Sequence, residues 1–170
     1  QVDAAFASTI SGPLYKLASS PRGIQYPVFA HSDKAGWARV NKVAPFFVPA
    51  FGTEGAGLSP TAKAEAATYP YPVLMTMKTT DADLAYNMTK AMVELYDDYK
   101  DGAPGNKGWD IKRQIFAWAI PMHDGAIRYF KEKGLWTAEY QAHNDALVKR
   151  QDTLAAAWAG AAATGEPLWR

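Results

Sequence analysis

Prolines interrupt the two longest apolar stretches of this 170-residue chain. Pro45 and Pro49 divide the stretch 43–51, and Pro72 lies near the start of the stretch 71–77. Proline lacks the backbone N–H that a continuing helix needs, so neither stretch can form one long regular helix. Neither stretch approaches the ~20 apolar residues that span a bilayer. The sequence therefore predicts short elements and no membrane-spanning helix.

Composition is typical of an ordinary globular protein. Hydrophobic residues make up 48%, charged residues 21% and aromatic residues 13%, which gives more apolar area than a disordered tail carries. The formal net charge is +1, and the basic residues are scattered, so we expect no nucleic-acid partner. The chain has no cysteine, which excludes disulfides and thiolate chemistry. We expect one core or two small lobes, and no cofactor.

The first residues, Gln1–Phe6, are typical of the middle of a domain. They do not form a signal peptide, so we expect the export signal of a secreted protein to lie upstream.

The first half of the chain is predicted to mix strands with helices. Pro13 suits the first turn of a helix, where its missing N–H costs nothing, and β-branched and aromatic residues favour strands. The predicted elements are a strand at 2–7, a helix after Ser11 that ends at Pro21, a strand at 24–29, a helix capped by Ser32 or Asp33 that reaches Val43, and a strand at 72–78.

The second half is predicted to be helical. A buried stripe at helical spacing is expected on a helix that starts at Thr80 or Asp81, and its residues are Leu84, Met88, Met92 and Leu95. Further helices are expected at 109–119, from an Asp124 cap to Gly134, and from a Thr137 cap onward, with fraying after Ala155. This order predicts an α/β lobe with helices packed across it.

The sequence contains no convergent catalytic or metal-binding set. His31, His123 and His143 have no partner at zinc-ligand spacing, and neither an HExxH nor a GxSxG motif occurs. His31 suits a turn or cap, and His143 suits a helix surface or contact. The carboxylates at 97–98 lie on a predicted helix, where we expect them to form a solvent-exposed face. A calcium site would need oxygen ligands that converge from a loop. We therefore expect no metal and no enzymatic activity.

Residues 51–57 (FGTEGAG) form a glycine-rich segment. Such a loop can cradle phosphates, but no Lys-Ser or Lys-Thr pair follows at the Walker spacing. A connector or a pocket wall is the favoured interpretation.

Residues 119–134 contain the most distinctive local pattern. Pro121 breaks the chain, His123 directly precedes a predicted helix, and Asp124 can cap that helix. A helix N-terminus beside a histidine can hold an anion. The same residues can form a structural hinge in which His123 bonds a backbone carbonyl, and the residues alone favour this structural interpretation.

Three segments resemble the TRAP transporter solute receptors of the TAXI family. Ile120–Gly134 is similar to the signature Ile/Val-Pro-Leu-His-Pro-Gly-Ala with its following aromatic pair, Glu and Gly, although Met122 replaces Leu and Asp124 replaces Pro. Asp83–Met92 is similar to the helix D-L-V-Y-x-L-T-K-A-L, and Val2–Phe6 to the strand (I/V)-D-A-A-F. The resemblance covers nearly the whole chain in order.

The resemblance implies the C-terminal half of a periplasmic-binding-protein type II fold, with a helical C-terminal third. Such a receptor has two α/β lobes that close on a small, usually anionic solute and deliver it to transporter membrane subunits. Residues 1–55 would be part of the second lobe and the crossover, residues 56–160 the return to the first lobe and the C-terminal helices, and residues 161–170 a tail. The implied ligand-binding residues are Phe6, Ser8, Thr53 and Glu54, with His123 at the hinge or pocket edge.

Two departures from the family pattern affect these expectations. Glu54 stands where the family has Tyr, so a carboxylate that would repel an anion replaces a stacking ring. The family's N-terminal half is missing, so we expect that half or another protein chain as a partner, since uncovered strand edges are a liability. The alternative function is a truncated receptor-like domain that serves as a structural or accessory subunit of a larger periplasmic or membrane complex.

Overall fold

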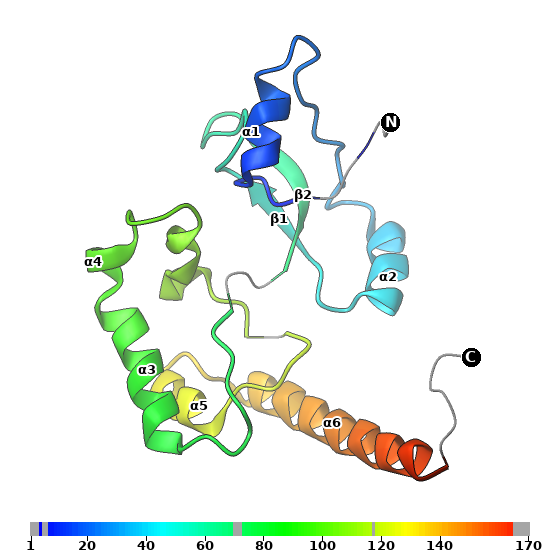
Figure 1. Cartoon of the computed structure of the whole chain (residues 1–170), viewed down its shortest axis with the longest axis vertical. Coiled ribbons are helices and arrows are strands. Elements are labelled where there is room, and N and C mark those ends of the chain that lie inside the picture. Colours follow the sequence, from blue (N-terminus) through cyan, green and yellow to red (C-terminus); the bar gives the residue numbers. More distant parts are fainter. Residues whose placement is uncertain (1–3, 5–6, 70–72, 117, 165–170) are drawn as a thin grey trace. The chain divides into compact units, whose positions relative to one another are not determined.

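The computed structural model describes residues 4, 7–69, 73–116 and 118–164. Its elements are α1 (Gly12–Ala18), α2 (Lys34–Val43), β1 (Val48–Gly52), β2 (Ala64–Thr68), α3 (Ala82–Glu94), α4 (Tyr96–Tyr99), the 3₁₀ turns η1 (Asn106–Trp109) and η2 (Ile111–Arg113), α5 (Asp124–Glu132) and α6 (Ala138–Thr164) (Figure 1). Unit 1 comprises Gln1–Pro72 and Lys100–Gly108, and unit 2 comprises Val73–Tyr99 and Trp109–Arg170. The chain is thus mixed α/β, as part of a binding-protein-like fold would be.

The two helices of unit 1 begin where the sequence predicts. Ser11 precedes α1, and Pro13 lies in its first turn. Asp33 caps α2 by accepting a hydrogen bond from Gly36 N at 2.8 Å. These two helix starts are confirmed, whereas the strand predicted at 2–7 lies mostly outside the described residues.

A single antiparallel hairpin makes the sheet of the described residues. β1 pairs with β2 so that Val48 lies opposite Thr68 and Gly52 lies opposite Ala64. The strand predicted at 24–29 is wrong, because Pro27 has no N–H to donate and, in this part of the described chain, only Phe29 N bonds the hairpin, at 3.0 Å from Glu65 O. The alanine-rich β2 was not expected, because alanine has a low strand propensity.

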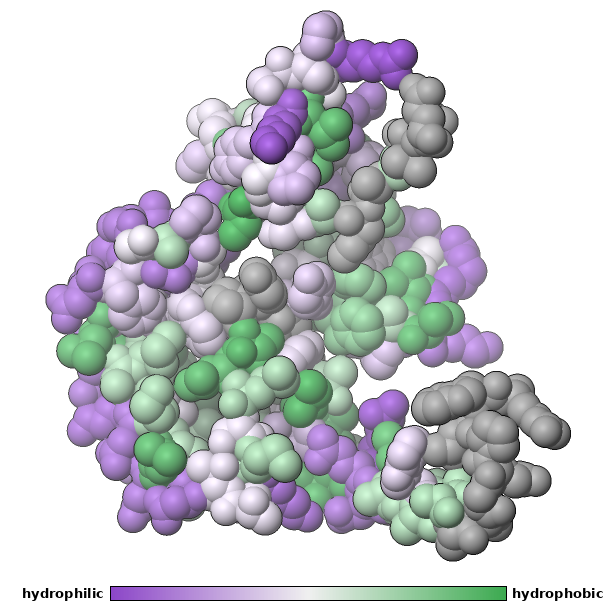
Figure 2. Space-filling model, in the orientation of Figure 1, coloured by the Kyte–Doolittle hydropathy of each residue, from purple (hydrophilic) through white to green (hydrophobic). Residues whose placement is uncertain are grey.

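The strand predicted at 72–78 is also wrong over its described residues. Residues 73–77 form no strand, and Leu74, Met75 and Met77 are exposed. An apolar run becomes a strand only when a neighbour receives its backbone hydrogen bonds, and none does so within the described chain. On the face that Figure 2 draws, hydrophobic residues lie among hydrophilic ones at the surface.

Helix α3 in unit 2 starts as predicted but buries a different face. Asp81 caps it by accepting a hydrogen bond from Leu84 N at 2.9 Å. The predicted buried stripe is wrong, because Leu84, Met88 and Leu95 are exposed. The face that packs inward instead carries Ala85, which is buried, and Tyr86 and Val93, which pack on the aromatic core.

The helix predicted at 109–119 is replaced by the turns η1 and η2. Asp110 competes with helix formation, because its side chain accepts a hydrogen bond from Lys112 N at 2.9 Å and caps η2. The chain then extends so that Phe116 enters the core of unit 2.

Three buried aromatic residues form that core: Phe116, Tyr129 and Phe130. The rings of Phe116 and Phe130 lie 4.8 Å apart at 66°, which is a favourable edge-to-face arrangement. Trp136 and Tyr140 also pack against Phe116, at 5.8 and 5.3 Å between ring centroids. Helix α5 therefore forms the centre of unit 2.

Helix α5 ends at a Schellman motif. Leu135 N donates to Phe130 O at 2.9 Å and Gly134 N donates to Lys131 O at 3.0 Å, while Gly134 has a φ of 68°. This confirms the predicted role of Gly134 as a helix terminator.

Helix α6 is the longest element. Thr137 Oγ1 accepts a hydrogen bond from Tyr140 N at 3.2 Å, which confirms the predicted cap. The predicted fraying after Ala155 is wrong, because α6 continues to Thr164. Alanine has the highest helix propensity, so this sequence favours helix even where nothing packs on it.

Candidate functional site

The glycine-rich segment of unit 1 is held in place by three hydrogen bonds around Ala56. Ala56 N donates to Thr9 O at 3.0 Å, and Ala56 O accepts from the Tyr26 hydroxyl at 2.8 Å. Leu58 N donates to Gly55 O at 3.1 Å and closes the turn. Because Ala56 is 1% exposed, these bonds are shielded from water. The segment is therefore fixed in position, and its role as a connector or a pocket wall stays a prediction.

Gly55 permits this arrangement. Its φ is 124°, which side-chain-bearing residues rarely adopt. A Cβ at this position would lie 2.5 Å from the carbonyl carbon of Thr9, closer than atoms can pack. The glycine loop and the Thr9 backbone, directly after Ser8, are thus in contact.

This contact brings two of the predicted site segments together. Ser8 is exposed, and its carbonyl accepts a hydrogen bond from Ser11 N at 3.0 Å. Thr53 is half-buried and Glu54 is exposed, both directly before Gly55. Phe6, the remaining predicted residue of this group, lies outside the described residues.

Two polar side chains beside this loop were not predicted as site residues. Ser11 Oγ is buried and hydrogen-bonds no described residue, although Ser11 lies at the N-cap of α1. The pKa of Tyr26 is raised, first by burial of its hydroxyl and then by the neighbouring Tyr15. The sequence signal for Ser11 was limited to a helix start, and nothing near Tyr26 indicated its distant partner Ala56.

His31 links α2 to the hairpin. The backbone N–H of His31 donates to Glu65 Oε1 at 2.6 Å, and the ring Nε2 lies 2.9 Å from Ala66 O. The ring lies 4.7 Å from that of Phe51 and 6.1 Å from that of Trp37. His31 does lie in a turn, as predicted, and these contacts make it a structural tie.

His123 in unit 2 caps α5. Its Nδ1 accepts a hydrogen bond from Gly125 N at 3.1 Å, so His123 and not the predicted Asp124 is the N-cap residue. An acceptor at Nδ1 requires the neutral ring with its proton on Nε2. The predicted bond from His123 to a backbone carbonyl is wrong, because the ring accepts from the Gly125 N–H instead. Since that N–H is engaged within the helix start, a structural role of this segment is still favoured over an anion site.

Gly125 also brings α5 into contact with α3. A Cβ there would lie 2.7 Å from Tyr86 N and 2.9 Å from the Ala85 side chain. Gly125 is buried, so the two helices pack backbone to backbone at this point.

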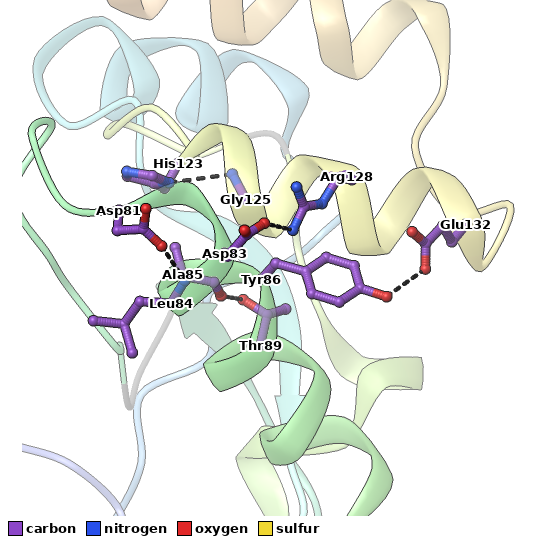
Figure 3. Close-up of polar contacts among 10 residues, drawn as sticks. All are labelled: Asp81, Asp83, Leu84, Ala85, Tyr86, Thr89, His123, Gly125, Arg128 and Glu132. Carbon is purple, nitrogen blue, oxygen red and sulfur yellow. Dashed lines mark hydrogen bonds and ion pairs between the residues drawn. The ribbon is translucent and has the colours of Figure 1, made fainter.

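Polar contacts continue along the same α3–α5 interface (Figure 3). Arg128 pairs with Asp83 at 2.6 Å, and its guanidinium lies 4.3 Å from the centre of the Tyr86 ring. The Tyr86 hydroxyl donates to Glu132 Oε2 at 2.7 Å, and this hydrogen bond is the main reason that the pKa of Tyr86 is raised. The helix 83–92 and the segment 120–134 therefore form one packed pair.

Asn144 connects the start of this segment to α6. It is 5% exposed, and its Oδ1 accepts a hydrogen bond from Met122 N at 2.7 Å. His143 Nε2 lies 2.5 Å from Trp118 O, which agrees with a helix-contact role. These two bonds fix the chain on both sides of Pro121.

The predicted site residues fall into different units. Ser8, Thr53 and Glu54 belong to unit 1, and His123 belongs to unit 2. Over the part of the chain that the structure describes, no three His, Cys, Asp or Glu side chains cluster as metal ligands do. None of the described helices combines the length and the apolar character that a membrane span requires.

Comparison with known protein families matches residues 28–134 to the NMT1-like family. The match covers more than half of the 170 residues and includes Thr53, Glu54 and His123 but not Ser8. No curated protein and no solved structure matches the chain.

Proposed function

The chain belongs to the NMT1-like family, which is periplasmic-binding-protein-like, and on this premise we propose that it is a solute-binding receptor subunit of a TRAP transporter of the TAXI type. The family is a binding-protein family and not an enzymatic one. The receptor would act in the periplasm, bind a small anionic solute by closure of two lobes of a type II fold, and deliver it to membrane subunits.

The TAXI assignment is supported by residues 83–92 and 120–134. Both resemble that family in sequence, and they form α3 and α5, which pack on each other through Gly125. Asp83, Tyr86 and Gly125, which match the family's motifs, each make contacts between these two helices. The assignment of residues 1–55 and 56–160 to two receptor lobes is part of this proposal.

The observation that carries the binding function is the hydrogen bond from Ala56 N to Thr9 O. It fixes the glycine loop against the segment after the first predicted strand, so that Ser8 and Thr53 can contact one small molecule. Pre-arranged polar groups on a fixed wall are typical of solute sites, because little ordering is required on binding. Phe6 and Glu54 would complete this side of the site, and His123 would lie at the hinge or pocket edge.

Glu54 sets an expectation about charge. An exposed carboxylate beside the solute would repel an anion, so Glu54→Gln should strengthen binding of a dicarboxylate probe such as succinate. Thr53→Val removes a hydroxyl that can donate to a carboxylate and should weaken succinate binding about tenfold, as the loss of one charge-assisted hydrogen bond does.

Isothermal titration calorimetry with succinate and with L-glutamate tests these assignments. Thr153→Val is the matched control, because Thr153 is exposed on α6 and its hydroxyl bonds only Lys149 O in its own helix. Equal affinities of the wild type, Thr53→Val and Glu54→Gln would reject the site. Native mass spectrometry of the purified protein would identify a co-purified solute and any companion chain.

The second candidate is a truncated receptor-like domain that acts as a structural or accessory subunit. Glu54 in place of the family's Tyr favours it, as do the apolar side chains that 73–77 and α3 expose. A companion protein chain without any bound solute in native mass spectrometry would support this candidate and reject the receptor.

A further inference from the structure

The tripeptide Asp-Gly-Ala occurs twice in the chain, at residues 101–103 and 124–126. An aspartate followed by glycine can react with its own backbone, because glycine has no side chain to keep its nitrogen away from the aspartate carboxyl group. The two copies are a matched pair, so a difference in their reactivity comes mainly from the fold around them.

The first copy is open to solvent. It follows α4 in a stretch that forms neither helix nor strand, and Asp101, Gly102 and Ala103 are all exposed. The Gly102 N–H donates no hydrogen bond to another described residue. Lys107 Nζ lies 3.3 Å from Asp101 Oδ1, but 70% of the Asp101 side chain is exposed, and such a surface ion pair holds a carboxylate only weakly. Both reacting groups are therefore accessible.

The second copy is held in the first turn of α5. The Gly125 N–H donates to His123 Nδ1 at 3.1 Å (Figure 3), and Gly125 is buried against α3. Asp124 is the first residue of α5. A ring between its carboxyl carbon and the next backbone nitrogen needs a rotation of ψ away from the helical value. Reaction at this copy therefore requires local opening of the helix.

We propose that Asp101–Gly102 converts spontaneously to isoaspartate in the folded chain, whereas Asp124–Gly125 is protected. The Gly102 nitrogen forms a bond to Cγ of the protonated Asp101 carboxyl group, and the carboxyl hydroxyl leaves with the amide proton as water. Water then hydrolyses the resulting succinimide ring. Opening at the side-chain carbonyl restores aspartate, and opening at the backbone carbonyl gives isoaspartate.

This modification would alter one connection between the two units. The chain passes from unit 2 to unit 1 between Tyr99 and Lys100, directly before the site. Isoaspartate routes the backbone through Cβ and Cγ, which adds one carbon atom to the connection and leaves the carboxylate directly on Cα. The ion pair with Lys107 would then lose its present geometry. The reaction does not depend on solute binding.

Peptide mapping by mass spectrometry tests the proposal on the full chain, stored at about pH 5, where part of an ordinary aspartate is still protonated. Electron-transfer fragmentation distinguishes isoaspartate from aspartate, and methylation by a protein isoaspartate methyltransferase measures the modified residues independently. Isoaspartate should accumulate at Asp101 at least about tenfold faster than at Asp124, because Asp124 reacts only after local opening. Circular dichroism verifies that the chain stays folded during storage.

The unfolded chain and one substitution separate the fold from the sequence. In concentrated urea both Asp-Gly-Ala copies should form isoaspartate at similar rates, since neither retains its surroundings. Gly102→Val should suppress the reaction at Asp101 at least about tenfold, because a β-branched side chain obstructs the approach to the nitrogen. Gly102 is not among the described glycines with a positive φ, so its backbone accepts valine.

Four results would each overturn the proposal. In the folded chain they are an absence of isoaspartate at Asp101 and equal rates at Asp101 and Asp124. The third is a rate at Asp101 that Gly102→Val leaves unchanged. The fourth is a difference between the two copies that persists in urea, because the fold would then not be its cause.

Discussion

Gly55 in unit 1 and Gly125 in unit 2 have the same role, because each allows two stretches of backbone to come into contact. A Cβ on Gly55 would lie 2.5 Å from the Thr9 carbonyl carbon, and one on Gly125 would lie 2.7 Å from Tyr86 N. Their surroundings differ: Thr9 belongs to a turn, whereas Tyr86 lies inside α3. Unit 1 thus uses glycine to bend and position a loop, and unit 2 uses it to bring two rigid helices together. A turn can shift to accept a methyl group, but a packed helix pair cannot do so without losing its other contacts.

The largest effect is therefore expected for Gly125→Ala. The added methyl group would push α5 away from α3 and disturb the contacts of Arg128 and Tyr86, at a cost of about 3 kcal/mol in the free energy of unfolding. Urea denaturation monitored by circular dichroism measures this cost. Gly160→Ala is the matched control, because a Cβ there has nothing within 4 Å. It should stabilise α6 by about 1 kcal/mol through helix propensity. Equal stability of the two variants would contradict the helix contact at Gly125.

Gly55→Ala should have the next largest effect. It combines a φ of 124° with a clash against Thr9, and we expect a loss of about 2 kcal/mol. Gly23→Ala separates the two causes, since Gly23 has a φ of 66° and open space around its Cα, and it should cost about 1 kcal/mol. If both variants lose the same stability, close approach to Thr9 is not what fixes the loop.

The smallest effect is expected from alkaline pH. The hydrogen bond to Glu132 raises the pKa of Tyr86 above its ordinary value of 10.0, and burial raises that of Tyr26. Folding therefore favours the neutral phenols. This contribution is fully present below the unfolded pKa near 10 and is lost as the pH rises through the folded value. The urea midpoint of the wild type should fall more steeply above pH 10 than those of Tyr86→Phe and Tyr26→Phe, and parallel curves for all three would refute the assignment.

Local signals in the sequence predicted helix starts and ends correctly. Asp33, Asp81 and Thr137 each form a short hydrogen bond within three residues, so neighbouring residues suffice to specify them. The helix end at Gly134 was predicted for the same reason, because the hydrogen bonds that close it join residues close in sequence. His123 was missed as a cap because histidine is a rare N-cap residue and Asp124 is a common one.

Strands and buried faces were predicted less successfully, because they depend on partners distant in sequence. Ile24–Phe29 has strand-forming side chains but bonds β2 only through Phe29 N, and Val73–Met77 pairs with no strand of the described residues, whereas Ala64–Thr68 pairs despite its alanines. The α3 stripe failed because periodicity identifies an apolar face but not the element that covers it. Of the predicted site, the contact between the glycine loop and Thr9 joins residues 47 positions apart by chain number, which no local pattern encodes.

Asn144 has a mechanical consequence for α6. The helix is clamped at its base, where Asn144 and His143 bond the chain near Pro121, and it runs on for 20 residues to Thr164. Those residues span about 30 Å, so α6 is a lever: a tilt of about 10° at Asn144 displaces the tip by about 5 Å. A small rearrangement at residues 118–123 would thus become a large movement at the far end. A spectroscopic label near Gly160 would amplify motions at the base that are too small to follow directly.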